Sequence, residues 1–319
     1  MLPGLIEGPV RRAVEDHGFG RRIEQVVEVG GGCINHGAHI VTDTGASLFL
    51  KWNDAAPAGM FDAEADGLLA LARPDAVRVP SPVAWSSAPA DTTSPRHTRG
   101  AEPTGASWLL MEHVAAGRPT RESEECLGVG LSRIHLAGAE ASVGEFGWRR
   151  DNWIGSLPQA NGPVASWADF WRDRRLAPQL ELARSRGQLA DGALDRVLDR
   201  VLDLTGVALA DVVTPELVHG DLWRGNWFAS ASGEPVLIDP AVYLGHGEVD
   251  LAMSELFGGF GTAFYQAYRD AHGLPDAYEA YRRDLYQLYY LLVHVNLFGA
   301  SYEAGSLRTA RRVVAALSG

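Results

Sequence analysis

The spacing of apolar residues changes near residue 120, and this change constrains the fold more than any other feature. Before it, short runs rich in strand-forming residues (VVEV at 26–29, HIVTD at 39–43 and SLFLKW at 47–52) are separated by glycine-rich or turn sequences. After it, apolar residues recur at helical spacing in ECLGVGLSRIHLAGA, in WADFWRDRRLAPQLELA and from Tyr278 to Phe298. We therefore predict an α+β fold with two lobes. Residues 1–113 would form a small antiparallel sheet with one helix, and residues 114–319 a larger, mainly helical lobe.

The helix expected in the smaller lobe follows the third strand. In MFDAEADGLLALARP, apolar residues recur at helical spacing from Phe61 to Ala72, and Pro74 ends the pattern. Two further apolar runs, VPSPVAW and SWLLMEHV, enclose residues 86–106, which are rich in Ser, Thr, Pro and Ala and have little to bury. We expect these residues to form a mobile hairpin loop.

The charge balance narrows the range of partners. A formal net charge of -12 and a pI near 5.3 disfavour broad surfaces for nucleic acid or anionic membranes, because both need basic patches. The N-terminal sequence lacks the order of regions of a signal peptide, and the apolar run LYQLYYLLVHVNLFGA is too short and too polar to span a bilayer. We expect a cytoplasmic protein, monomeric or homodimeric, that binds neither nucleic acid nor a membrane.

A glycine-rich segment, VGGGCINHGAH, lies between the first two expected strands. Bare backbone amides at such a position can surround the oxygens of a phosphate group, which makes its central residues candidates for nucleotide binding: Gly30, Gly31, Gly32, Cys33 and Ile34. A flexible hairpin is the alternative for this segment alone. The segment matches neither the Rossmann fingerprint nor the Walker motif, because a strand follows it and the sequence GK[ST] is missing.

A lysine and a glutamate near this segment favour the phosphate interpretation. Lys51 lies between Leu50 and Trp52 on the strand after the glycine-rich segment, and Glu64 lies on the apolar stripe of the following helix. A carboxylate on a buried stripe needs a cationic partner, and Lys51 is well placed to be that partner. A Lys/Glu pair beneath a glycine-rich loop holds the phosphates of ATP in kinases.

The sequence HGDLWRGN places Asp221 and Asn226 five positions apart, which is the spacing of the protein-kinase catalytic loop. The apolar run PVLI then ends at Asp239. One carboxylate and one amide suit Mg2+, which prefers oxygen ligands and keeps part of its water. A turn or a helix cap would be the alternative role for either aspartate.

Five segments carry a resemblance to a known family, in this order along the chain: GGGCINHG, FGWRRDNWIGSLPQANG, HGDLWRGN, LIDPAVYLGHGEVDLAMSELFGGF and YYLLVHVNLFG. Together they resemble the fructosamine kinase (ketosamine 3-kinase) family of the protein-kinase-like fold, over essentially the whole chain. HGD with a downstream asparagine also occurs in aminoglycoside and choline kinases. The tryptophan after HGDL, the DPA sequence and the DNWIG segment are more specific to the family.

This resemblance implies a bilobal protein-kinase-like fold and the ATP-dependent phosphorylation of the 3-hydroxyl group of a ketosamine, the sugar adduct that glycation leaves on an amine. The phosphorylated adduct then breaks down and frees the amine. Family correspondence makes Asp221 the catalytic base and Asn226 and Asp239 the ligands of Mg2+. Lys51 and Glu64 would orient the phosphates of ATP.

The resemblance also places the hinge and the substrate site. The backbone of Glu112, His113 and Val114 would bind adenine, and residues 86–106 look longer than in the family. We expect the sugar to contact side chains near the base, and the candidates are Trp223, Asp151, Asn152, His294 and Asn296. The other tryptophans of this region, and equally His294, could instead be packing residues: Trp148, Trp153, Trp167 and Trp171. Asp250 would support the catalytic loop or cap its own helix.

Two alternatives share parts of these motifs. A kinase for aminoglycosides or other small molecules would use the same ATP-binding groups, and a non-catalytic nucleotide-binding protein would keep only the fold. The second is disfavoured because every core catalytic position is occupied. For Cys33, bare amides and Lys51 create an electropositive setting that favours the thiolate, so Cys33 is a candidate for reversible oxidation, including a disulfide between the Cys33 residues of two chains. The alternative is a small residue that merely fits beside the glycines. Cys126 is expected to be a core residue.

Overall fold

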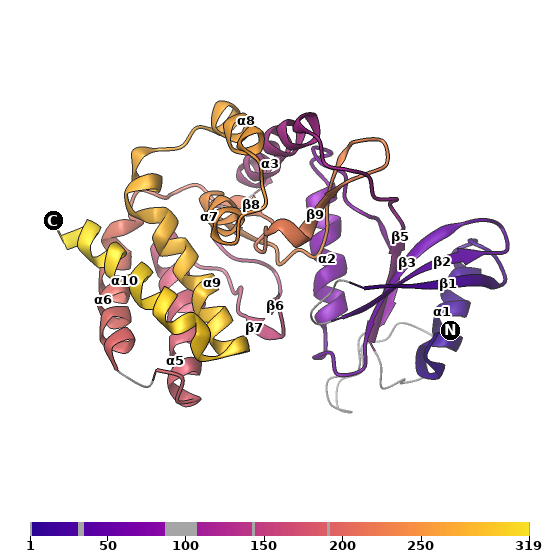
Figure 1. Ribbon diagram of the computed structural model, residues 1–319, viewed down its shortest axis with the longest axis horizontal. Helices are drawn as coiled ribbons and strands as arrows, with labels where there is room; N and C mark the ends of the chain where they lie inside the picture. The colour runs from indigo at the N-terminus through magenta and orange to yellow at the C-terminus, as the bar shows by residue number, and fades with distance from the viewer. Residues whose placement is uncertain (1, 31–34, 87–106, 142–143, 190–191, 319) are drawn as a thin grey trace.

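The computed structural model describes residues 2–30, 35–86, 107–141, 144–189 and 192–318. Figure 1 shows a sheet with two helices beside a larger, mainly helical part that contains the C-terminus. This arrangement confirms the predicted α+β class, in which an antiparallel sheet precedes the helices. The lobe boundary at residues 113 and 114 stays a prediction.

The sheet has five antiparallel strands in the order β1-β2-β3-β5-β4. Its strands and helices are α1 (Gly4–Asp16), β1 (Ile23–Val29), β2 (His36–Thr42), β3 (Ser47–Asn53), α2 (Met60–Ala72), β4 (Pro82–Ser86) and β5 (Ser107–Glu112). The three strands and the helix that the sequence predicts are confirmed within a few residues. The helix α1 was not predicted.

The two helices cover opposite faces of the sheet, because successive side chains of a strand point to opposite faces. On one face, Ile6 of α1 shares a hydrophobic core with Leu50 and Leu110. On the other face, Phe61 of α2 shares a second core with Leu109. Helix α2 lies between the sheet and the helical part, where it contacts both (Figure 1).

In its described residues, the helical part contains long helices and three two-stranded antiparallel sheets. Its elements are α3 (Arg121–Ala141), β6 (Asn152–Ile154), β7 (Leu157–Gln159), α4 (Trp167–Phe170), η1 (Trp171–Leu176), α5 (Ala177–Ser185), α6 (Ala193–Ala208), β8 (Glu216–Val218), η2 (Arg224–Asn226), β9 (Trp227–Ala229), β10 (Pro235–Leu237), β11 (Tyr243–Gly245), α7 (Glu248–Leu256), α8 (Thr262–His272), η3 (Tyr278–Arg282), α9 (Arg283–Phe298), η4 (Ala300–Tyr302) and α10 (Glu303–Ser318). The three predicted helical stretches are confirmed, two of them with a π-helical turn in their course.

Some expectations fall outside the described residues or differ from the structure. Of residues 86–106, expected to be a hairpin loop, Ser86 is the last residue of β4 and the rest lie outside the described ranges, as does Cys33. Cys126 is exposed, so its assignment to the core was wrong. It lies on the amphipathic helix α3, where a shift of one position moves a side chain from the buried face to solvent. In the described part of the chain, no helix is long and apolar enough to cross a membrane.

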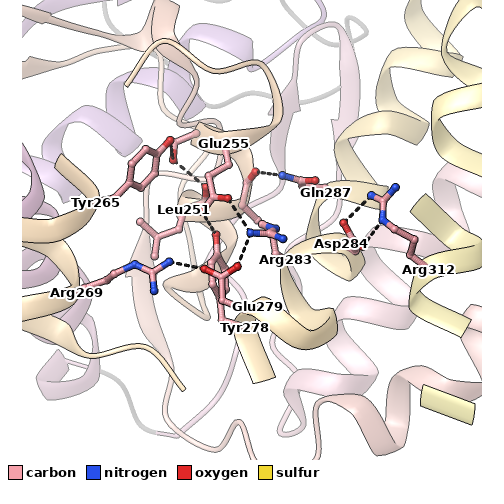
Figure 2. Close-up of polar contacts among 12 residues, drawn as sticks. Leu251, Glu255, Tyr265, Arg269, Tyr278, Glu279, Arg283, Asp284, Gln287 and Arg312 are labelled. Atoms are coloured by element: carbon pink, nitrogen blue, oxygen red, sulfur yellow. Dashed lines mark hydrogen bonds and ion pairs between the residues drawn. The ribbon is translucent and has the colours of Figure 1, made fainter. Parts of the chain in front are cut away.

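A polar network fixes α7 against α9 in the helical part (Figure 2). The Arg283 guanidinium donates hydrogen bonds to Glu255 at 3.3 Å and to Glu279 at 2.5 Å. The Tyr278 hydroxyl donates to Glu255 at 2.8 Å, and the Gln287 amide donates to a backbone carbonyl of α7 at 3.0 Å. Helices α7 and α9 both form hydrogen bonds to the predicted catalytic loop, as described below.

The same substitution, glycine to alanine, should have opposite effects on stability at two positions in helices. In α3, a Cβ atom on Gly138 would clash with the backbone nitrogen of Leu217, the residue in the middle of β8. We expect Gly138→Ala to lower the free energy of unfolding by about 1–3 kcal/mol through overpacking. In α6, Gly206 has no atom within 4 Å of its Cβ position, and Gly206→Ala should raise stability by about 0.4–1 kcal/mol. Urea unfolding of both variants measures the two changes, and equal effects would contradict this packing of α3 on β8.

Candidate active site

A cavity of about 400 Å³ lies between the sheet and the helical part. Its lining includes five of the polar residues singled out from the sequence: Lys51, Glu64, Asp221, Asn226 and Asp239. These residues come from β3, α2 and two loops of the helical part. Residues far apart in the sequence therefore meet in one place.

Lys51 lies at the centre of the charged groups. It points to the α2 side of β3, since Leu50 beside it faces the core of α1. Its Nζ atom donates to Glu64 Oε1 at 2.6 Å and to Asp239 Oδ1 at 2.8 Å. Burial alone would lower the pKa of Lys51, but the negative charges of Asp239 and Glu64 outweigh this effect and hold the pKa above its usual value. Lys51 is therefore a fixed positive charge.

Asp221 and Asn226 form the catalytic loop, which follows β8. The Asn226 side-chain amide donates to the backbone carbonyl of Asp221 at 2.8 Å and to Asp221 Oδ2 at 3.1 Å. The pKa of Asp221 is raised to about 7, first because of burial and then because of the negative charge of Asp239. A carboxylate with a raised pKa in a cavity is a typical candidate for proton transfer.

Asp250 holds the backbone of this loop in place. Its two carboxylate oxygens accept hydrogen bonds from the backbone amides of His219, at 2.7 Å, and Gly220, at 2.8 Å. The Tyr290 hydroxyl of α9 donates to the carbonyl of Gly220 at 2.8 Å. Of the two roles considered for Asp250, the structure therefore shows support of the catalytic loop.

Asp239 lies just after β10 in a backbone conformation that few residues adopt. Its φ angle is 55°, in the left-handed region that Asp and Asn tolerate better than most residues. A residue held there costs about 1–3 kcal/mol and often marks a functional site. The turn brings the Asp239 carboxylate to Lys51 and the cavity.

The oxygen atoms of Asp239 and Asn226 fit a magnesium ion. Because Nδ2 of Asn226 donates to the catalytic loop, Oδ1 is its remaining atom for a cation. Asp239 adds a carboxylate that is only half-buried. One amide oxygen and one carboxylate on the same cavity wall match the preference of Mg2+ for a few protein oxygens.

A second group of possible metal ligands lies behind the catalytic loop. Atoms of His135, Glu216 and His272 lie within 4.8 Å of one another. Each atom already has a hydrogen-bond partner, since His272 Nε2 lies 3.0 Å from Glu216 Oε1, and His135 contacts Tyr268 and Asp250. Burial raises the pKa of Glu216, but the neighbouring histidines outweigh it and lower the pKa to about 2. We interpret this cluster as support for β8 and Asp250.

The residues predicted to bind the nucleotide belong to the glycine-rich segment and to the end of β5. Gly30 lines the cavity, whereas Gly31, Gly32, Cys33 and Ile34 lie outside the described residues. Glu112, His113 and Val114 connect β5 to the helical part, and none of the three is among the described residues that line the cavity. The Glu112 carboxylate accepts a hydrogen bond from Arg78 at 2.6 Å, and the ring of His113 stacks on His39 with centroids 3.8 Å apart.

Two of the predicted substrate residues line the cavity. Trp223 is 37% exposed and stands over Gly225, where a Cβ atom would meet the indole ring at 2.4 Å. Asn152 also lines the cavity, but its amide donates to the carbonyl of Val242 at 2.9 Å and its oxygen accepts from Gln159 at 2.7 Å. Asn152 therefore shapes the wall, and Trp223 offers an open aromatic face.

The other three predicted substrate residues have partners away from the described cavity lining. Asp151 accepts a hydrogen bond from the backbone of Asn161 at 2.8 Å. The His294 ring packs against three aromatic rings, Phe257, Phe298 and Tyr302. The Asn296 amide donates to Gln179 at 2.8 Å. These partners give each side chain a structural role.

Sequence reasoning missed other parts of the cavity wall. Trp153 and Gly155 line it, although Trp153 was expected to pack elsewhere, and His36 lines it from the start of β2. Trp153 and Gly155 belong to the DNWIG segment, in which only the two polar residues were predicted to contact the substrate. Trp148, also assigned to packing, donates a hydrogen bond from Nε1 to Asp66 of α2 at 2.8 Å.

The fold, a five-stranded antiparallel sheet followed by a mainly helical part, is that of a class of phosphotransferases. Aminoglycoside phosphotransferase APH(4)-Ia shares the fold, with a TM-score of 0.62 at 13% identity over 97% of this chain and 99% of that one. Residues 9–316 match the model of the fructosamine kinase family. The chain belongs to the fructosamine kinase family.

Named relatives agree with this assignment. The chain is 38% identical to a chloroplastic protein-ribulosamine 3-kinase of Arabidopsis thaliana, over 96% of this chain and 87% of the relative. It is 32% identical to the ketosamine-3-kinase of Mus musculus, over 89% of this chain and 93% of the relative. A crystal structure from Thermobifida fusca YX-ER1, named provisionally as a fructosamine-3-kinase, superimposes with a TM-score of 0.80 at 37% identity over 95% and 97% of the chains.

The position of Asp239 predicts how nucleotide binding depends on metal. Asp239→Ala removes the carboxylate on the cation side of the cavity, so the affinity for Mg2+-AMP-PNP should fall about tenfold or more, the worth of a contact to a charged group. Binding of AMP-PNP in EDTA should change little and serves as the control. Calorimetric titration with and without Mg2+ measures both, and an unchanged metal-dependent affinity would remove Asp239 from the metal site.

Proposed function

We propose that this protein is an ATP-dependent kinase that phosphorylates the 3-hydroxyl group of a ketosamine. The observation that carries the proposal is the convergence of Lys51, Asp221 and Asp239 on one cavity, within a chain of the fructosamine kinase family. Lys51 supplies a positive charge where phosphate oxygens would lie, and Asp221 supplies a base. The cavity thus contains one group for the phosphate that is transferred and another for the hydroxyl group that accepts it.

The groups act by positioning and by electrostatics, because phosphoryl transfer needs little covalent help from the protein. Asn226 and Asp239 would hold Mg2+, which neutralises phosphate charge when it is bound with ATP. Lys51, oriented by Glu64, holds the phosphates. Asp221 orients the sugar hydroxyl toward the phosphate and accepts its proton.

The ketosamine is proposed as the substrate from the family and its named members. The relatives from Arabidopsis thaliana and Mus musculus are named for ribulosamine and ketosamine substrates. Trp223 supports this choice, since a half-exposed indole beside the base offers an apolar face on which a sugar ring can stack. The backbone from Glu112 to Val114 remains our proposal for the adenine contact, and the cytoplasm for the compartment.

An aminoglycoside is the second candidate substrate. APH(4)-Ia, which shares the fold, forms a ternary complex with ADP and hygromycin B. Its identity to this chain is 13%, so the likeness concerns the fold. ATP consumption by the purified protein should be measured in parallel with ribulosyl-lysine, fructosyl-lysine and kanamycin. We expect turnover with at least one of the two ketosamines, and turnover with kanamycin alone would reject the proposed substrate.

The role of Asp221 predicts the effect of a conservative substitution. Asp221→Asn keeps the size of the side chain but removes the proton acceptor, so turnover with the active ketosamine should fall by about 10²- to 10⁴-fold. The affinity for AMP-PNP should stay nearly unchanged, which shows that the variant is folded. Steady-state kinetics at saturating ATP give the comparison, and turnover near that of the natural protein would reject Asp221 as the base.

A further inference from the structure

Three nearby residues of α2 contact three different parts of the candidate site. Glu64 pairs with Lys51, on the side where the phosphates of ATP would bind. Asp66 accepts hydrogen bonds from Trp148 and Arg149 of the helical part. Gly67 lies against the residue after Asp239, since a Cβ atom there would be 3.0 Å from the ring of Pro240.

Asp66 is a buried carboxylate whose hydrogen-bond donors come from one segment of the helical part. The residue is 8% exposed, and such a charge must be compensated by donors. Trp148 Nε1 donates to Oδ2 at 2.8 Å, Arg149 Nε donates to Oδ2 at 3.3 Å, and Arg149 Nη2 contacts Oδ1. The orientation of α2 therefore depends on the position of these two residues.

The segment that supplies these donors, residues 148–161, also forms the wall of the cavity on the proposed sugar side. Trp153 and Gly155 of this segment line the cavity. Its far end is fixed to the helical core, because the buried Arg175 donates to Asn161 Oδ1 at 2.6 Å. The backbone amide of Trp148 donates to the carbonyl of Asn161 at 2.6 Å, which closes the segment into a loop. Trp148 and Arg149 therefore belong to the same closed loop as the wall, and a shift of that loop as a whole would move the donors of Asp66.

We propose that Asp66 is a positioning residue that couples ketosamine binding to nucleotide binding. The inference rests on the proposed function and adds a regulation of the same site. A ketosamine that fixes the position of the wall at Trp153 would also fix the positions of Trp148 and Arg149. Through Asp66, it would then fix helix α2, which orients Glu64 and Lys51. By thermodynamic linkage, the nucleotide must favour ketosamine binding by the same factor.

The chain contains a matched control for this contact. Asp62, one helical turn before Asp66 on α2, accepts a hydrogen bond from the Trp85 indole at 3.1 Å. Trp85 belongs to β4 of the sheet, so this contact holds α2 within its own part of the molecule. Asp62→Asn and Asp66→Asn are thus the same substitution on the same helix. Each removes a negative charge beside an indole donor, but only Asp66→Asn also removes an ion pair with the helical part, that of Arg149.

The test measures the affinity for Mg2+-AMP-PNP by calorimetry, with and without a saturating ketosamine. AMP-PNP keeps the complex from turning over. We expect ribulosyl-lysine or fructosyl-lysine to tighten AMP-PNP binding by about fivefold or more in the natural protein. The factor should fall below about twofold in Asp66→Asn and stay near the natural value in Asp62→Asn.

Arg149→Met tests the contact from the other side. The Arg149 side chain is 59% exposed, so its removal should leave the fold intact even if Asp66→Asn lowers stability. The coupling factor should again fall, and the double variant Asp66→Asn/Arg149→Met should lose little more than either single variant, because both remove the same interaction.

The possible failures are distinguishable. If neither ketosamine binds the natural protein, both the proposed substrate and the coupling are rejected. If a ketosamine binds but leaves the affinity for AMP-PNP unchanged, the proposed function survives and the coupling is rejected. If Asp62→Asn lowers the coupling factor as much as Asp66→Asn, the effect is a general loosening of α2, and Asp66 loses its assigned role.

Discussion

The ammonium group of Lys51, held between Glu64 and Asp239, is the interaction on which the site depends. It joins β3, α2 and the turn after β10, and so links the sheet to the helical part. A buried ammonium is costly without carboxylates nearby, and two carboxylates without the ammonium would repel each other. Each of these three charged groups therefore stabilises the positions of the other two. The chemistry of the site therefore depends on the relative position of the sheet and the helical part.

The sequence predicts the contacts that follow from short-range rules. Strand alternation turns Lys51 away from the face of Leu50, and helical spacing puts Glu64 on the buried stripe of the next helix. Because only a short connection separates the two elements, their meeting could be inferred. Asp221 and Asn226 are similarly local, since a fixed spacing within one loop brings the amide to the carboxylate. The class of fold followed from the change of hydrophobic periodicity.

Contacts between distant segments could not be derived in this way. Asp66 and Arg149 lie 83 positions apart in the sequence, with helix α3 between them, and no periodicity relates them. His294 and Asn296 are polar residues on an apolar helix, a pattern that suits a ligand contact and a satisfied interior residue equally well. Their partners, such as Phe257 and Gln179, become known only when the helices are packed. Phe298 lies one turn further along the same helix, but Phe257 comes from a distant segment that the sequence around His294 does not indicate.

Strands β3 and β5 each contribute side chains to both faces of the sheet, and this limits where the chain can gain or lose residues. Lys51 pairs with Leu109 and Leu50 with Leu110, and the two pairs face different hydrophobic cores. One residue gained or lost inside β3 before Lys51, with the rest of the strand kept in register, would exchange the faces and direct the ammonium of Lys51 into the apolar core of α1. A change in length is therefore less disruptive in the connections between the strands than inside β3. The sequence from 87 to 106, between β4 and β5, is a position where length can accumulate without a change in the parity of either strand.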